Sequence, residues 1–380
     1  MKLELIATAT FGLEAVVKRE LENLGFKVLK SEDAKITFSG DERGIVKSNL
    51  WLRCADRVQI KMGEFNVYEF EELFQQTKAL PWEDWIPIDG KFTVSGTSVK
   101  SKLHSVPACQ SIVKKAIVEK LKETYCVDNF EETGAEYPVK VTVLKDRATL
   151  TIDTSGAGLH KRGYRVKDVR APIKETLAAA MIQLSFWREG RILVDPCCGS
   201  GTIPIEAALI GRNIAPGLSR SFISEEWENI PEKFWKEERR AAFEAVNYDA
   251  DLKIFASDID KGAIRAAEEN AMEAGVDDCI TFEVKDISKS KTAGKSGIMI
   301  INPPYGERIG EAKEIKQMYS ALKKFVTDDD TWSFFVITAD KDFEKLAFGR
   351  PADRRRKLYN GRIETCYYQF HGQKESPRIQ

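Results

Sequence analysis

The sequence predicts an α/β protein in which a mostly parallel, doubly wound sheet of seven strands follows a smaller α+β module. From about residue 171, strand-like and helix-like segments alternate, which is typical of parallel sheets with helical crossovers. The last two strand-like runs, 357–359 and 363–370, flank Asn360-Gly361, a strong signal for a β-hairpin. We therefore expect the sheet to end in an antiparallel pair.

The first 155 residues predict the α+β module. Their first part, 1–67, follows the βαββαβ order of a ferredoxin-like unit, with its elements over 3–8, 11–24, 27–31, 34–39, 41–52 and 57–67. The second part, 68–155, has helix-like segments near 68–79 and 106–125, and strand-like segments near 92–99, 139–144 and 148–153.

The large domain is expected over 171–372, after a basic linker over 156–170 and before a frayed tail over 373–380. Its expected parallel strands lie over 191–195, 253–258, 280–284, 297–301 and 332–338. Helices are expected over 202–210 and 261–274, each directly after a strand.

Composition indicates a globular protein rather than a membrane or secreted one. Of 380 residues, 43% are apolar and 10% aromatic, and no apolar run approaches the roughly 18–20 residues of a membrane span. The N-terminus lacks the pattern of a signal peptide. Seven cysteines with no C-x-x-C pair argue against a zinc site and against disulfides, so we expect a cytoplasmic protein without a metal.

Local charge suggests contact with phosphates, although the net charge is only −1. Two basic clusters can hold phosphates, and the alternative for either cluster alone is a solvated face. They consist of Lys161, Arg162 and Arg165 in the linker and of Arg354, Arg355 and Arg356 near the C-terminus.

A turn of small residues joins the first strand of the large domain to its helix. Its candidate ligand-binding residues are Asp195, Pro196, Gly199, Ser200 and Gly201. Glycines let a ligand approach the backbone, and the helix start offers free N–H groups. The turn matches neither G-x-G-x-x-G nor a P-loop. Its position at the carboxyl end of the first strand is where doubly wound folds bind ligands.

Acidic residues follow the next two strands. Asp258, with Ile259 beside it, ends the second strand, and its carboxylate can accept both hydroxyls of a ribose. Asp286 follows the third strand and can accept from an adenine amino group. Asp260 is expected to cap the next helix instead.

The tetrapeptide Asn302-Pro303-Pro304-Tyr305 follows the fourth strand and predicts chemistry on an amine. The prolines exclude a helix and remove N–H donors. The Asn302 side-chain oxygen and the Pro303 carbonyl can accept from an exocyclic base amine, aim its lone pair and stabilise the positive charge that develops on nitrogen. Tyr305 offers a ring face to a flipped base.

Several segments together resemble one family: 159–165, 171–176, 195–201, 213–222 and 302–308. They are similar to those of bacterial 23S rRNA guanine-N2 methyltransferases with an N-terminal THUMP domain. The resemblance implies a Rossmann-like class I methyltransferase domain behind a ferredoxin-like and THUMP module that binds structured RNA. It also implies S-adenosyl-L-methionine as cofactor, S-adenosyl-L-homocysteine as product and a single modification.

The resemblance assigns further residues. It implies that Pro196, Gly199 and Gly201 surround the cofactor, and that segment 171–176 lies beside its amino-acid end. The cofactor contacts expected from that segment come from Pro172, Lys174, Glu175 and Thr176. Asn302 is expected to contact the cofactor as well as the base. Gly306-Glu307-Arg308 favours the rRNA group of enzymes, and the resemblance implies that Arg308 and the two basic clusters contact RNA.

Three alternatives remain open on the sequence. The tetrapeptide also serves adenine-N6 methylation of RNA or DNA, although the RNA-type N-terminal module weighs against DNA. THUMP domains also occur in tRNA guanine-N2 enzymes. A non-catalytic RNA-binding factor with this fold is the third, and the intact Asn302 and glycine turn disfavour it. The sequence does not determine the oligomeric state.

Overall fold

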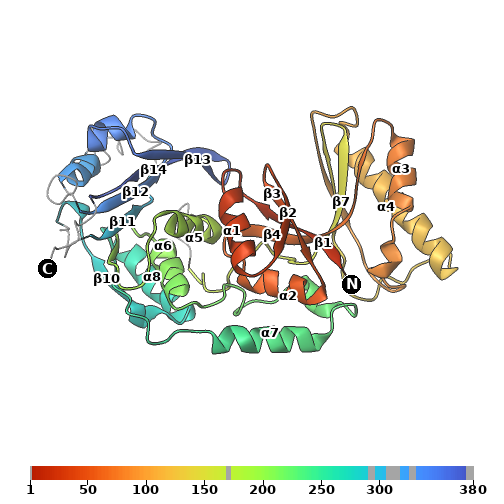
Figure 1. The fold of residues 1–380 in the computed structure, drawn as a ribbon, viewed down its shortest axis with the longest axis horizontal. Coiled ribbons are helices and arrows are strands. Elements are labelled where there is room, and N and C mark those ends of the chain that lie inside the picture. Colours follow the sequence, from red (N-terminus) through yellow and green to blue (C-terminus); the bar gives the residue numbers. More distant parts are fainter. Residues whose placement is uncertain (1, 168–172, 290–295, 305–316, 325–330, 374–380) are drawn as a thin grey trace. The chain divides into compact units, whose positions relative to one another are not determined.

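The computed structural model describes residues 2–167, 173–289, 296–304, 317–324 and 331–373 (Figure 1). The chain forms two compact units whose sequence segments interleave. Unit 1 consists of Met1–Ala9, Lys18–Leu159 and Ser221–Arg240, and unit 2 of Thr10–Val17, His160–Arg220 and Ala241–Gln380. No described helix has the length and apolarity needed to cross a membrane.

Unit 1 is built on one seven-stranded sheet in the order β2-β3-β1-β4-β7-β6-β5. The strands are β1 (Leu3–Ala9), β2 (Lys27–Glu32), β3 (Lys35–Gly40), β4 (Ala55–Asn66), β5 (Val94–Val99), β6 (Val139–Leu144) and β7 (Arg147–Asp153). The helices are α1 (Glu14–Asn23), α2 (Glu42–Trp51), α3 (Phe70–Lys78) and α4 (Val106–Tyr125), and α3 packs along α4 (Figure 1).

The βαββαβ order expected for the first 67 residues is confirmed by β1 to β4 with α1 and α2. Asp41 caps α2, because its carboxylate accepts from Gly44 N at 2.7 Å. The antiparallel pairing of β4 with β7 was not expected. It joins the two parts of the α+β module into one continuous sheet.

Unit 1 also contains a segment that the sequence inserts between two strands of the large domain. Segment 221–240 carries most of α7 (Glu232–Glu244) and the buried Trp227. The indole of Trp227 stacks on Tyr137 with ring centroids 4.7 Å apart, and its Nε1 donates to Glu136 O at 2.9 Å. The Ser224 hydroxyl donates to Thr154 O at 2.7 Å. The insert is therefore part of the core of unit 1.

Unit 2 contains the second seven-stranded sheet, in the order β10-β9-β8-β11-β12-β14-β13. Its strands are β8 (Leu193–Asp195), β9 (Ile254–Asp258), β10 (Ile280–Val284), β11 (Ile298–Ile301), β12 (Ser333–Thr338), β13 (Arg354–Asn360) and β14 (Ile363–Phe370). Its helices include α5 (Glu175–Leu184), α6 (Thr202–Gly211) and α8 (Lys261–Glu273).

The strands β10, β9, β8, β11 and β12 are parallel, and β14 pairs antiparallel with β12 and β13. The expected parallel sheet with a closing hairpin is confirmed. This order and the antiparallel last pair are the arrangement expected of a class I methyltransferase. Buried aromatic residues, including Trp332, Phe334 and Phe343, form the core on one face of the sheet.

Candidate functional site

The candidate site lies at the carboxyl edge of the unit 2 sheet. The strand order reverses between β8 and β11, because the chain continues from β8 to β9 on one side and reaches β11 on the other. Such a switch point is where doubly wound sheets bind ligands. Asp195 ends β8, Asp258 ends β9, and Asn302 follows β11 directly.

The glycine turn after β8 needs backbone conformations that favour glycine. Gly199 has φ +54° and Gly201 has φ +82°. A Cβ on Gly201 would lie 3.0 Å from the Cβ of Ala267, so α8 leaves no room for a side chain there. Gly201 precedes the first residue of α6, and the neighbouring Ser200 is buried.

Asp258 holds this turn in place. One carboxylate oxygen accepts from Gly199 N at 3.0 Å and the other from Asp260 N at 3.0 Å. Its role is thus partly structural, although each carboxylate oxygen keeps capacity for a second donor. The neighbouring Ile259 is 71% exposed, so an apolar surface is available beside the carboxylate. Asp260 caps α8 through Gly262 N, as the sequence predicted.

Asp286 lies after β10 and is half-buried. Its Oδ1 accepts from Ser288 N at 2.8 Å. Hydrogen bonds from Ser288 lower the pKa of this carboxyl, so it is an ionised acceptor at neutral pH. That charge state suits the acceptor role expected for it.

Asp195 is a fully buried acid whose pKa is strongly raised. It is 1% exposed; Oδ1 accepts from Cys197 N at 3.1 Å, while the buried Oδ2 has no hydrogen-bond partner within the described residues. Burial, together with the negative charge of Asp258, raises the pKa of Asp195 to about 8. An unsatisfied buried carboxyl oxygen indicates a missing donor, such as the cationic or hydroxyl group of a ligand.

Segment 173–176 precedes and begins α5. Glu175 and Thr176 are buried, and Lys174 is half-buried at the N-terminus of the helix. The Thr176 hydroxyl is a second buried polar atom without a partner in the described part of the chain. Glu175 is bound by the Arg165 Nε at 2.8 Å. Pro172 lies outside the described residues.

The structure corrects the expectation for two linker arginines. Arg162 is 3% exposed, and its guanidinium faces the fully buried carboxylate of Glu206. Arg165 bonds Glu175, Ile173 O at 3.1 Å and the Thr202 hydroxyl at 3.0 Å. These guanidinium groups are used inside unit 2, so an RNA backbone would have to displace buried partners to reach them.

The other basic residues predicted to bind RNA are more accessible. Lys161, Arg354 and Arg355 are exposed, and Arg356 is half-buried. Arg355 pairs with Glu344, and Arg356 donates to Gly12 O at 3.0 Å. The Arg354–Arg356 run forms the start of the edge strand β13 rather than a loop, because β13 begins three residues earlier than expected. Arg308 lies outside the described residues.

The tetrapeptide begins where β11 ends. Asn302 is half-buried, Pro303 is buried and Pro304 is exposed, while Tyr305 lies outside the described residues. β11 is buried along its whole length and pairs with β8. A rigid, buried strand therefore leads directly into Asn302 and fixes the backbone next to the glycine turn. The described residues contain no group of three metal-ligating side chains.

Comparison with known proteins identifies the fold. The model of the RMKL-like methyltransferase domain matches residues 162–369, which is more than half of the chain. The chain belongs to the RMKL-like methyltransferase family. In this family member, models of the RlmL ferredoxin-like domain and the THUMP domain match residues 4–59 and 67–153. Family and fold together make it a methyltransferase that uses S-adenosyl-L-methionine.

Two curated relatives of this RMKL-like chain cover nearly all of it. "Putative RNA methyltransferase YpsC" of Bacillus subtilis is 52% identical over 97% of this chain and 96% of its own length. Ribosomal RNA large subunit methyltransferase K/L of Syntrophotalea carbinolica is 35% identical over 97% of this chain. The RMKL-like chain spans only 53% of that second relative.

Solved structures of similar proteins agree in fold. A protein from Listeria monocytogenes, described as a "predicted N6-adenine-specific DNA methylase", is 48% identical with a TM-score of 0.93, covering 98% of this chain and 97% of that one. SMU.472, solved in complex with SAH, is 44% identical with a TM-score of 0.92, and each chain is covered to 99%. The two unsatisfied buried oxygens, the glycine turn and the strand-end acids of this chain fit such a ligand.

Removal of the Arg165 guanidinium should weaken cofactor binding. Glu175 would remain buried without its partner, and the first residues of α6 would lose a tether at Thr202. We expect Arg165→Ala to raise the Kd for S-adenosyl-L-methionine about tenfold or more, since an unpaired buried charge distorts its surroundings. Titration calorimetry measures this. Arg165→Lys should recover only part of the affinity, because lysine lacks the planar fork; an unchanged Kd for both variants contradicts the role.

The raised pKa of Asp195 predicts a pH-dependent stability of the cofactor-free protein. Its carboxyl is protonated up to about pH 8 when folded, but only up to about pH 4 when unfolded. The folded state therefore holds the extra proton in this window. The free energy of unfolding should fall by about 1.4 kcal/mol per pH unit as pH rises through it. Urea unfolding of Asp195→Asn should lack this contribution; parallel profiles for both proteins would refute it.

Proposed function

We propose that this protein transfers a methyl group from S-adenosyl-L-methionine to the exocyclic N2 amine of a guanine in 23S ribosomal RNA. The single observation that carries the proposal is the position of Asn302-Pro303 at the end of β11, beside the strand that bears the glycine turn. The relatives named for RNA methylation, one of them for the large ribosomal subunit, support RNA as the substrate.

The chemistry follows from the groups at the end of β11. The Asn302 side-chain oxygen and the Pro303 carbonyl accept hydrogen bonds from the base amine, whose lone pair is otherwise delocalised into the ring. These hydrogen bonds orient the nitrogen lone pair toward the methyl group to be transferred. They also stabilise the positive charge that develops on nitrogen. We propose Tyr305 as the stacking face for the flipped base, next to Pro304. S-adenosyl-L-methionine supplies the methyl group when bound.

The cofactor contacts proposed for this chain come from the carboxyl edge of the sheet. The orphaned oxygens of Asp195 and Thr176 are suited to its amino-acid end, and Asp258 and Asp286 to its ribose and adenine. The THUMP match supports the proposal that the N-terminal module binds structured ribosomal RNA.

Adenine-N6 methylation is the second candidate. The Listeria monocytogenes relative supports it, because the name given to that protein specifies adenine and DNA. The same pair of acceptors serves either amine, so Asn302 and Pro303 do not discriminate. The THUMP match favours RNA in both cases.

A product analysis tests the proposal. Deproteinised ribosomal RNA and transfer RNA are incubated with methyl-labelled cofactor, digested to nucleosides and separated by chromatography. We expect label in N2-methylguanosine from 23S RNA. Label in N6-methyladenosine would replace the guanine assignment, and label only in transfer RNA would replace the ribosomal one. No transfer to any RNA, with normal cofactor binding, would refute the proposed activity.

A further inference from the structure

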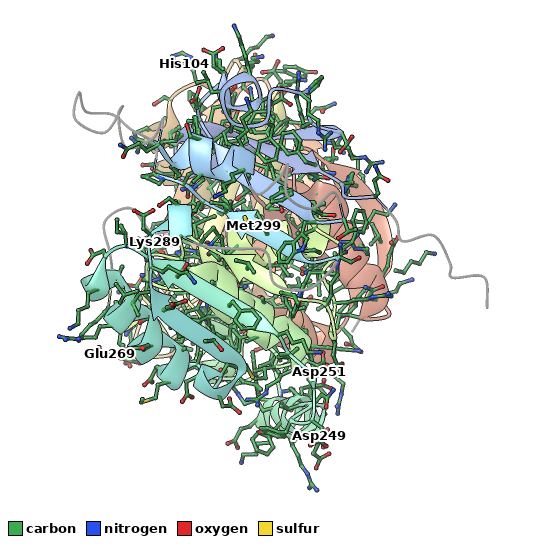
Figure 2. All side chains as sticks on the ribbon, turned by 90° about the vertical axis from the view of Figure 1, so that its left-hand side faces the viewer. His104, Asp249, Asp251, Glu269, Lys289 and Met299 are labelled. Atoms are coloured by element: carbon green, nitrogen blue, oxygen red, sulfur yellow. The ribbon has the colours of Figure 1, made fainter. Side chains whose placement is uncertain are left out.

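A large open pocket lies on unit 2 at the end of the sheet opposite the glycine turn. Its volume is about 1390 Å³, and its floor is formed by residues at the amino ends of β8, β11 and β12, among them Arg191, Ser296 and Ser333. Figure 2 marks the two ends of the sheet: Asp251 precedes β9, and Lys289 follows β10 at the other end. The pocket is therefore separate from the cofactor site.

Positive charge is concentrated in this pocket. Its lining includes four cationic side chains, Arg188, Arg191, Lys253 and Arg354, against one acid, Glu189. Lys253 is paired with the nearby Asp251 at 2.9 Å.

Of the remaining cations of the pocket, Arg191 donates to Ser296 O at 2.6 Å, whereas two others lack a carboxylate in the described part of the chain. Within the described residues, the guanidinium groups of Arg188 and Arg354 have no carboxylate partner. Burial and the positive charge of Arg188 lower the pKa of Arg191. The crowded cations would be stabilised by an anion in the pocket.

Phe186 gives the pocket an aromatic wall that the fold does not require. It follows the C-terminal end of α5 with φ +61°, a backbone conformation that glycine adopts at least cost, and the residue is 62% exposed. The neighbouring Trp187 is buried and supplies the apolar anchor of this turn. The Phe186 ring lies 6.0 Å from the His371 ring, which itself contacts Phe335 at 5.8 Å.

An exposed aromatic ring among cations is a combination that binds single-stranded nucleic acid, because each base has a π-face and each linkage a negative charge. We propose that this pocket binds a single-stranded segment of RNA, with a base stacked on Phe186 and phosphates between Arg188 and Arg354. The inference rests on the proposed function only for the choice of RNA as the polymer. It gives the enzyme a substrate contact away from the methyl-transfer site.

Phe186→Gly and the double variant Arg188→Glu/Arg354→Glu test the pocket. The probe is a fluorescein-labelled uridine oligomer of about 12 nucleotides, followed by anisotropy over a range of salt concentrations. We expect Phe186→Gly to weaken binding at least about fivefold through lost stacking. The double variant should weaken binding and reduce the slope of log K against log salt by about 1.4, or about 0.7 for each phosphate.

The matched control is Arg265→Glu, which reverses an exposed arginine on α8 outside the pocket lining. Its affinity should stay within about twofold of the wild type, because one distant surface charge is screened. Phe186→Gly is expected to fold normally, because glycine adopts the positive φ without strain. Its melting temperature should therefore not be lower than that of the wild type.

The location is tested separately by crosslinking. An oligomer containing 4-thiouridine should label the peptide around Phe186, mapped by mass spectrometry. The inference is overturned if both variants bind the oligomer with unchanged affinity and no crosslink maps to the peptide around Phe186. It is also overturned if a polyglutamate peptide displaces the oligomer completely and its own binding requires the same residues. Methyl transfer to ribosomal RNA is scored independently. If the protein methylates ribosomal RNA but the pocket variants bind the oligomer as the wild type does, only the pocket proposal is refuted. If binding depends on the pocket but no methyl group is transferred, only the proposed activity is refuted.

Discussion

Asn302→Ala should reduce methyl transfer by about 10²- to 10³-fold, the cost of losing one preorganised acceptor at a developing charge. The side chain follows the buried strand β11, so its removal leaves the strand and the glycine turn in place. The Kd for S-adenosyl-L-methionine should therefore change by less than about threefold, and the loss should fall on kcat. Single-turnover kinetics with labelled cofactor and calorimetry measure the two quantities.

Asn23→Ala is the matched control for this experiment. Asn23 is an exposed asparagine at the end of α1 in unit 1, so its truncation removes the same amide without touching the site. Full transfer by Asn302→Ala would exclude the proposed acceptor role. A large loss of cofactor affinity in Asn302→Ala, with transfer limited only by binding, would reassign Asn302 to the cofactor.

Trp227→Ala should lower the free energy of unfolding of unit 1 by about 3–5 kcal/mol, the usual cost of emptying a buried tryptophan site. The indole is 1% exposed, stacks on Tyr137, and meets Trp85 edge-on with centroids 6.2 Å apart. Its truncation also leaves Glu136 O without the indole donor. Urea unfolding followed by circular dichroism, with hydrogen exchange of the amides of β6, measures the effect.

Phe243→Ala provides the comparison for Trp227→Ala. Phe243 lies on α7 and is 62% exposed, so its loss should change stability by less than about 0.5 kcal/mol. Equal and small effects of the two substitutions would mean that segment 221–240 adds little to unit 1. A large effect of Trp227→Ala confined to unit 2 amides would contradict its place in unit 1.

Most strands of both units could be predicted from the sequence because their apolar residues alternate or form short runs that end in turn residues. Among the described helices, α5 and α7 could not. α5 is buried on nearly all sides, from Glu175 to Ile182, so it shows no one-sided apolar stripe. α7 lies in the long insert between β8 and β9, and no predicted strand directly precedes it to indicate where a helix would begin.

The acids and glycines of the site were predictable because they follow strand ends, and chain position alone puts them at one sheet edge. The roles of Arg162 and Arg165 could not be predicted. A cluster of basic residues in a sequence does not reveal which guanidinium group is buried against Glu206 or Glu175. The signal that could have found them is the acid itself: Glu206 and Glu175 stand in otherwise apolar helices and require a partner.

The interleaving of the two units limits how the protein can be divided. A fragment that ends at Leu159 would lack segment 221–240, and the complementary fragment would carry Trp227 without Tyr137. Each piece would lack part of the core of unit 1. Exchanging the N-terminal module for a foreign RNA-binding domain would therefore require more than one junction in the chain. A recombination event between residues 159 and 221 would separate Tyr137 from Trp227, two residues of one core.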